Sequence, residues 1–116
     1  MKKLLAIMTL SLLACNNSFA GSVRVIDGDT IVLNGEKIRF TGIDTPELKQ
    51  TCSQNDQEID CGLNAKILLI KKIGKNVPKC ISAGKDVYKR TLAECFVNSE
   101  SLSKFLVRSG YAFAYR

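Results

Sequence analysis

The fold is decided by the stretch VRVIDGDTIVLNGEKIRF, residues 23–40. Apolar and polar side chains alternate along it in three runs, and a period of two residues is typical of half-buried β-strands. The runs are separated by Asp27-Gly28 and by Asn34-Gly35, and an Asn-Gly pair between strands is a strong hairpin signal. We therefore predict a three-stranded antiparallel meander.

After the meander, the pattern predicts a helix, two strands and a second helix. The first helix covers residues 62–73, the strands cover residues 77–82 and 91–97, and the second helix ends at Gly110. The apolar face of the first helix is predicted to consist of Leu63, Ile67, Ile70 and Ile73. Five strands with a helix inserted after the third indicate an α+β, mainly β fold: a five-stranded OB-fold Greek-key barrel with a short second helix. Periodicity alone leaves other α+β barrels open.

Composition narrows the chemistry. The 116 residues include 17 Lys and Arg, 11 Asp and Glu, five Cys and no His. The lack of histidine excludes a His general base, a Ser-His or Cys-His pair and a His-ligated zinc ion. The apolar fraction of 46% and the charged fraction of 24% are ordinary for a folded domain. A net charge of +6 is compatible with a polyanionic substrate and equally with many secreted proteins.

The N-terminus predicts export. A basic start is followed by an uncharged stretch over residues 4–14, which is shorter than the ~20 residues needed to cross a bilayer. Small residues before and at Ala20 fit a cleavage site, so we expect a signal peptide over residues 1–20 and one domain over residues 21–116. That domain is expected to be secreted or periplasmic, without a transmembrane helix. A lipobox-like sequence leaves open lipid anchoring through Cys15.

The other cysteines form an even set, namely Cys52, Cys61, Cys80 and Cys95. In an oxidising compartment they predict two disulfides, for which three pairings are possible. The local pairing of Cys52 with Cys61 and of Cys80 with Cys95 closes short loops and fits the predicted strands. A zinc site formed by all four is disfavoured, because no two of them are separated by two residues.

Candidate site residues lie in three segments, residues 27–30, 39–47 and 86–90. Taken singly, each segment is ordinary. Taken together, Asp29, Asp44 and Glu47 supply hard oxygen donors at predicted strand ends, the ligand class that calcium or magnesium needs. Arg39 and Arg90 accompany them, and a guanidinium binds phosphate oxygens two at a time. A carboxylate-held cation flanked by two arginines indicates phosphoryl transfer.

In this order and at these spacings, the three segments resemble the thermonuclease family, the staphylococcal-nuclease-like domains, in its exported, cysteine-containing bacterial type. The resemblance runs from about residue 23 to residue 116 and includes the segment 106–110. It implies an OB barrel and a calcium-dependent nuclease. Such an enzyme cleaves single-stranded or duplex DNA and RNA with little sequence preference and leaves 3′-phosphorylated products.

The resemblance also implies residue roles. One calcium ion would be held by the carboxylates of Asp29 and Asp44 and the backbone carbonyl of Thr45. Glu47 would act as general base on the attacking water. Arg39 would neutralise the phosphoryl oxygens, and Arg90 would stabilise the added charge of the transition state.

Four further residues are implied to contact substrate. Tyr88 falls where the family's loop tyrosine lies near the phosphate. Lys89 stands where the family usually has Gly, and its charge would help to bind phosphate. Tyr111 and Tyr115 are candidates to stack on bases, although covering the end of the barrel is an equally good role for them.

Two other functions remain alternatives. The chain could be a nucleic-acid-binding OB module without catalysis, but such a module need not keep the complete set of acids and arginines. It could also be a disulfide-bonded surface protein that uses the barrel as a scaffold. The nuclease interpretation predicts a monomer without a protein partner.

Overall fold

The computed structural model describes residues 21–115, so the predicted signal peptide and Cys15 lie outside the described residues. The meander is confirmed. Its antiparallel strands are β1 (Val23–Asp27), β2 (Thr30–Leu33) and β3 (Glu36–Phe40). Asn34 and Gly35 join β2 to β3 with φ angles of 50° and 83°, the left-handed conformation that a tight hairpin turn requires.

The sheet continues from β3 to two later strands. β8 (Thr91–Val97) pairs in parallel with β3 and antiparallel with β7 (Lys79–Lys85), and the short β9 (Glu100–Ser101) also pairs with β8. Cys80 and Cys95 lie directly opposite each other on β7 and β8 and form a disulfide.

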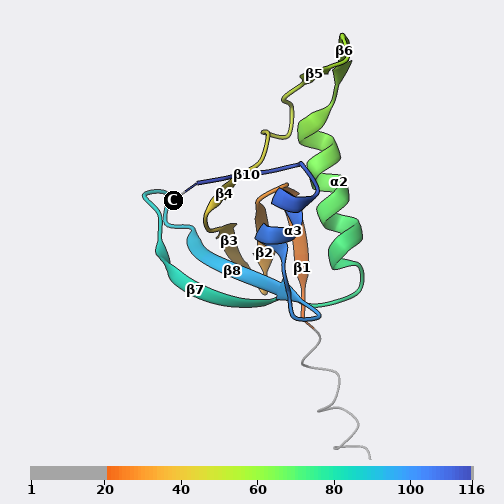
Figure 1. The fold of residues 1–116 in the computed structure, drawn as a ribbon. Helices are drawn as coiled ribbons and strands as arrows, with labels where there is room; N and C mark the ends of the chain where they lie inside the picture. The colour runs from red at the N-terminus through yellow and green to blue at the C-terminus, as the bar shows by residue number, and fades with distance from the viewer. Residues whose placement is uncertain (1–20, 116) are drawn as a thin grey trace, which may run out of the picture.

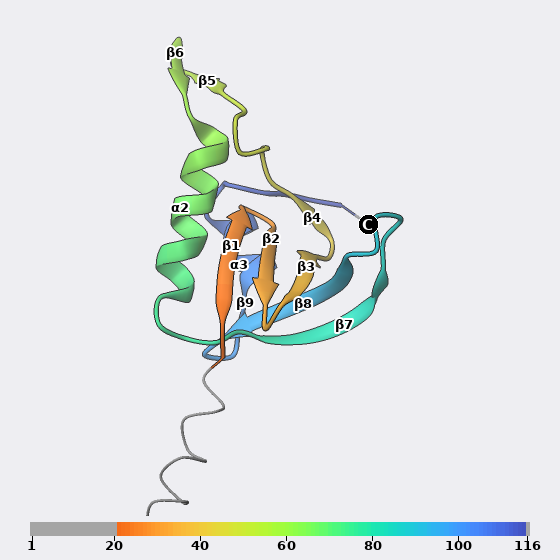
Figure 2. The ribbon, with the colours of Figure 1, turned by 180° about the vertical axis from the view of Figure 1, so that it is seen from behind.

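The predicted mainly β class with two helices is therefore observed, but a closed barrel is not. Within residues 21–115 the strand order is β1-β2-β3-β8-β7, and β1 and β7 are the two edges. The edges stay apart because the helix α2 (Cys61–Ile73), and not β7, packs against β1 (Figure 1). Figure 2 shows the same arrangement from behind, with α2 beside β1 and β7 running along β8 at the other edge of the sheet.

The first helix was placed correctly, but three of the four residues predicted for its buried face are wrong, and only Ile73 is buried as predicted. The structure buries Gly62, Ala65, Leu69 and Ile73, whereas Leu63, Ile67 and Ile70 are 38–46% exposed. The reason is that α2 approaches the turn between β1 and β2 closely, through small residues on both sides. A Cβ added to Gly28 would lie 2.9 Å from the Cβ of Ala65, so only small side chains fit where the helix meets the turn between β1 and β2. Apolar periodicity does not detect such a contact.

The helix also does not follow the third strand directly. Between them lie β4 (Ile43–Asp44), paired with β10 (Phe113–Ala114), and a hairpin of β5 (Cys52–Gln54) and β6 (Gln57–Ile59). The hairpin projects beyond the start of α2 (Figure 1). It has a polar sequence with little apolar alternation, so its only signal is the Asn55-Asp56 turn, where both φ angles are positive.

The second helix, α3 (Leu102–Arg108), packs on the sheet. Ser101 caps it by accepting a hydrogen bond from the backbone N–H of Lys104 at 3.3 Å. Leu102 and Leu106 are fully buried in one core with Ile31 and Phe40. No helix of the described chain is long and apolar enough to span a membrane.

Two neighbouring substitutions on α2 test which face is buried. Leu69→Ala removes a fully buried side chain and should lower the free energy of unfolding by about 2–5 kcal/mol. Ile70→Ala is the matched control, because Ile70 is 46% exposed, and its effect should be well below that of Leu69→Ala. Urea unfolding measures both. A larger loss for Ile70→Ala would support the face predicted from periodicity.

Candidate active site

The acidic and arginine residues predicted from the sequence surround one pocket of about 380 Å³ at an end of the meander. Asp29 comes from the turn between β1 and β2, Arg39 from β3 and Asp44 from β4. Glu47 lies in the exposed loop after β4, and Arg90 immediately precedes β8. The pocket is lined by Asp27, Asp29, Arg39, Asp44, Thr45, Pro46, Glu47, Gln50 and Arg90.

Arg39 joins the two acidic strand ends. Its Nη2 atom lies 2.5 Å from Asp44 Oδ1 and 3.4 Å from Asp29 Oδ2. Its Nη1 atom donates a hydrogen bond to the carbonyl oxygen of Phe40 at 2.7 Å. The Arg39 side chain is only 11% exposed, so these partners replace water around a buried charge.

Asp29 is held by the turn on one side and by the β4 loop on the other. Its Oδ1 atom accepts a hydrogen bond from Thr30 Oγ1 at 3.0 Å, and its Oδ2 atom accepts one from the backbone N–H of Thr45 at 3.2 Å. The carboxylate of Asp29 therefore faces the pocket from a fixed position beside the Thr45 backbone.

Asp27, the last residue of β1, is a second acid beside this turn. Its Oδ1 atom accepts a hydrogen bond from the backbone N–H of Asp29 at 3.3 Å. Partial burial raises the pKa of Asp27 above 3.8, and the side-chain hydrogen bond with Asp29 and the charge of Asp29 raise it further. We did not single out Asp27 as a site residue, although the Asp-Gly-Asp spacing was the available signal.

The carboxylate oxygens that face this pocket belong to the ligand class that a hard divalent cation takes. Among residues 21–115, no three His, Cys, Asp or Glu side chains are grouped closely enough to hold an ion alone. Asp29 and Asp44 would therefore need a backbone carbonyl and water, which is common for calcium with its six to eight oxygen ligands. Thr45 Oγ1 adds a buried oxygen without a hydrogen-bond partner in the described chain.

Asp86 anchors the loop that carries Arg90. Its carboxylate accepts hydrogen bonds from Arg90 Nε at 2.7 Å and from the backbone N–H groups of Tyr88 and Arg90, both at 2.9 Å. Desolvation acts to raise the pKa of Asp86, but the hydrogen bonds from Arg90 and Tyr88 outweigh it, so the pKa lies below 3.8. Because Asp86 binds the Nε edge, the two terminal nitrogens of Arg90 are not used by this pair.

Lys89 adopts the conformation for which glycine is usual. Its φ angle is 66°, a left-handed value that is uncommon for residues with a side chain. The turn before Arg90 therefore keeps a glycine-like backbone despite the lysine.

The four residues predicted to contact substrate do not line this pocket. Tyr88 is 77% exposed, and its ring lies 5.5 Å from the Arg90 guanidinium carbon. Lys89 is also exposed. Tyr111 packs against the hydrophobic core. Tyr115 is half-exposed, and its backbone N–H donates to the carbonyl of Gly42.

Comparison with known proteins identifies the family. The family model for staphylococcal nuclease homologues matches residues 37–116, which is more than half of the chain. The chain therefore belongs to the staphylococcal nuclease homologue family.

Three relatives illustrate the similarity. The chain is 33% identical over 95 residues to the succinoglycan biosynthesis protein ExoI of Rhizobium meliloti, covering 79% of this chain and 50% of that protein. It is 31% identical over 99 residues to an uncharacterized endonuclease of Haemophilus influenzae, covering 81% and 51%. It is 34% identical over 95 residues to endonuclease YncB of Bacillus subtilis, covering 77% and 44%. The chain thus spans about half the length of these curated relatives.

The raised pKa of Asp27 predicts a pH dependence of stability. The folded state binds the Asp27 proton more tightly than the unfolded state, so ionisation of Asp27 lowers the free energy of unfolding as pH rises through this pKa. Asp27→Asn should therefore have a higher melting temperature than wild type at pH 7 in calcium-free buffer. This difference in melting temperature should become smaller toward pH 3, where Asp27 of the wild type is increasingly protonated. Calorimetry measures it. Asp56→Asn, in the β5–β6 turn, is the control, and an equal gain there would contradict the explanation.

Proposed function

We infer that the chain is a calcium-dependent nuclease that hydrolyses phosphodiester bonds of DNA and RNA with little sequence preference. The observation that carries this proposal is the convergence of four carboxylates and two arginines on one pocket in a staphylococcal nuclease homologue. Endonuclease names among the relatives support it. Export by cleavage after Ala20, or anchoring through Cys15, remains part of the proposal, because two disulfides suit a secreted or periplasmic protein.

The arginines address the charge of the substrate. A phosphodiester is an anion that repels a water nucleophile, and its negative charge grows as the transition state forms. Arg39 faces the pocket from the sheet, and Arg90 faces it from the loop that Asp86 anchors. Their guanidinium groups enter from different elements, so one can neutralise the ground-state oxygens while the other binds the added transition-state charge.

The carboxylates divide between two tasks. Asp29 and Asp44, with the Thr45 carbonyl, would hold one calcium ion. When bound, calcium would supply further neutralisation of the phosphoryl oxygens. Glu47 is exposed at the mouth of the pocket and is free to act on water as a general base.

Hydrolysis at this site would proceed by in-line displacement. Glu47 accepts a proton from water while the water oxygen forms a bond to phosphorus. The bond between phosphorus and the 5′ oxygen breaks, and that oxygen takes a proton from solvent water, to which Glu47 later returns the proton it accepted. The products are a 3′-phosphate and a 5′-hydroxyl.

Substrate contacts outside the pocket would come from the Arg90 loop. Tyr88 and Lys89 are both exposed beside Arg90, which supports a contact with the strand that leaves the pocket. Tyr115 offers a half-exposed ring for base stacking, whereas Tyr111 serves mainly in packing. The protein would act as a monomer.

The test is cleavage of single-stranded and duplex DNA oligonucleotides by the oxidised protein with calcium or with excess chelator. Cleavage should require calcium, and Arg90→Ala or Glu47→Gln should reduce kcat by ~100-fold or more. Arg108→Ala is the matched control, since Arg108 pairs with Glu100 and does not line the pocket. A folded protein that binds single strands without cleaving them would support the binding-module alternative instead.

A further inference from the structure

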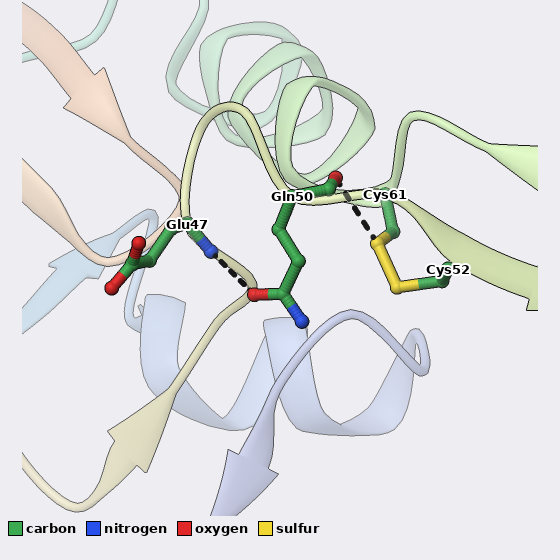
Figure 3. Close-up of a disulfide and its surroundings, with 4 residues drawn as sticks. All are labelled: Glu47, Gln50, Cys52 and Cys61. Atoms are coloured by element: carbon green, nitrogen blue, oxygen red, sulfur yellow. Dashed lines mark hydrogen bonds between the residues drawn. A yellow bond between two sulfur atoms is a disulfide. The ribbon is translucent and has the colours of Figure 1, made fainter.

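We propose that Gln50, held in place by the Cys52–Cys61 disulfide, is a positioning residue that fixes Glu47 for catalysis. This inference rests on the proposed nuclease function, because it concerns the residue that would act on water. Its basis is a chain of contacts that runs from the disulfide through Gln50 to the backbone of Glu47 (Figure 3).

Gln50 forms hydrogen bonds with both the backbone N–H and the backbone carbonyl of Glu47. Its side-chain Oε1 atom accepts a hydrogen bond from the backbone N–H of Glu47 at 3.1 Å. Its own backbone N–H donates to the carbonyl oxygen of Glu47 at 2.8 Å. The Glu47 backbone is thereby fixed on both sides, while its carboxylate remains directed away from Gln50 (Figure 3).

The other side of Gln50 is fastened to the start of α2. Its carbonyl oxygen accepts a hydrogen bond from the backbone N–H of Gly62 at 3.1 Å. The same oxygen lies 3.4 Å from Cys61 Sγ, which is a packing contact because a disulfide sulfur carries no hydrogen. Cys61 is in turn bonded to Cys52, so the segment that follows Gln50 is tied to the helix by a covalent link.

The fit between this loop and the helix leaves no spare room. A Cβ added to Gly62 would lie 1.7 Å from the carbonyl oxygen of Glu47 and 2.9 Å from the carbonyl carbon of Leu48. Glycine is therefore required at this position, where the start of α2 packs directly against the Glu47 backbone.

Glu47 needs these contacts because the loop that carries it makes few stabilising contacts by itself. Residues 47–51 are all exposed and form no strand. A general base must be held close to its working geometry, and a displacement of about 1 Å can cost on the order of 100-fold in rate. The loop meets that demand through Gln50 and the disulfide, since it has no buried side chain to anchor it.

The second disulfide provides a contrast within the same chain. Cys80 and Cys95 bridge two strands that are already hydrogen-bonded to each other, and Cys95 is fully buried in the core. That disulfide supports the sheet, whereas Cys61 of the first disulfide lies against the carbonyl oxygen of Gln50. Loss of either disulfide should lower stability, but only loss of Cys52–Cys61 should displace Glu47.

The first test is Gln50→Met, which keeps the length of the side chain and removes the acceptor oxygen. With calcium and a single-stranded DNA oligonucleotide, kcat should fall about tenfold or more, with KM changed by less than about twofold. Gln50→Glu keeps an acceptor oxygen and should recover most of the rate. Gln57→Ala, on the exposed β6 strand, is the control and should match wild type.

A second readout does not depend on activity. Amide hydrogen exchange at Glu47 should become faster in Gln50→Met and in the double variant Cys52→Ala/Cys61→Ala, and stay unchanged in Gln57→Ala. The effects of Gln50→Met and of the double cysteine variant on kcat should be strongly non-additive, because both act through one contact chain. Cys80→Ala/Cys95→Ala should lower the melting temperature but leave kcat unchanged below it.

The outcomes separate the two proposals. If wild type does not cleave DNA in calcium, the proposed function is wrong and this inference is wrong with it. If wild type cleaves but Gln50→Met matches it in kcat and in Glu47 exchange, only the positioning role is overturned.

Discussion

The structure depends most on the buried guanidinium of Arg39. It sits on β3 and contacts Asp29 of the first turn, Asp44 of β4 and the carbonyl of Phe40. One side chain thus fixes the relative positions of the meander and the segment that leaves it. A buried charge is tolerated only when paired, so the two aspartates are needed for the fold of this region as well as for its chemistry.

On the other side of the pocket, two glycines allow close packing of α2. Gly28 and Gly62 allow α2 to approach the first turn and the Glu47 backbone more closely than any other residue would. The helix therefore touches both the turn that carries Asp29 and the loop that carries Glu47. The pKa of Asp27 is raised, first because the side chain is partly buried and then because Asp29 lies beside it. Perturbed carboxyl pKa values of this kind are frequent at functional sites.

Much of this was accessible from the sequence, for identifiable reasons. Asn34-Gly35 has a strong local preference for a hairpin turn. The residues at the motif positions, Asp29, Arg39, Asp44, Glu47 and Arg90, all line one pocket. The buried face of α2 was missed because it is selected by small residues, which carry no hydrophobic signal. The role of Gln50 could not be predicted, because its partners come from a polar loop and a helix start that only the tertiary structure brings together.

We propose that the paired acids of this pocket form a single calcium site beside two arginines. Isothermal titration of calcium into the oxidised protein tests it most directly, independently of any substrate. We predict one ion per chain for wild type and for the Asp56→Asn control, and loss of binding in Asp29→Asn. No binding by wild type, or binding that Asp29→Asn leaves unchanged, would contradict the account.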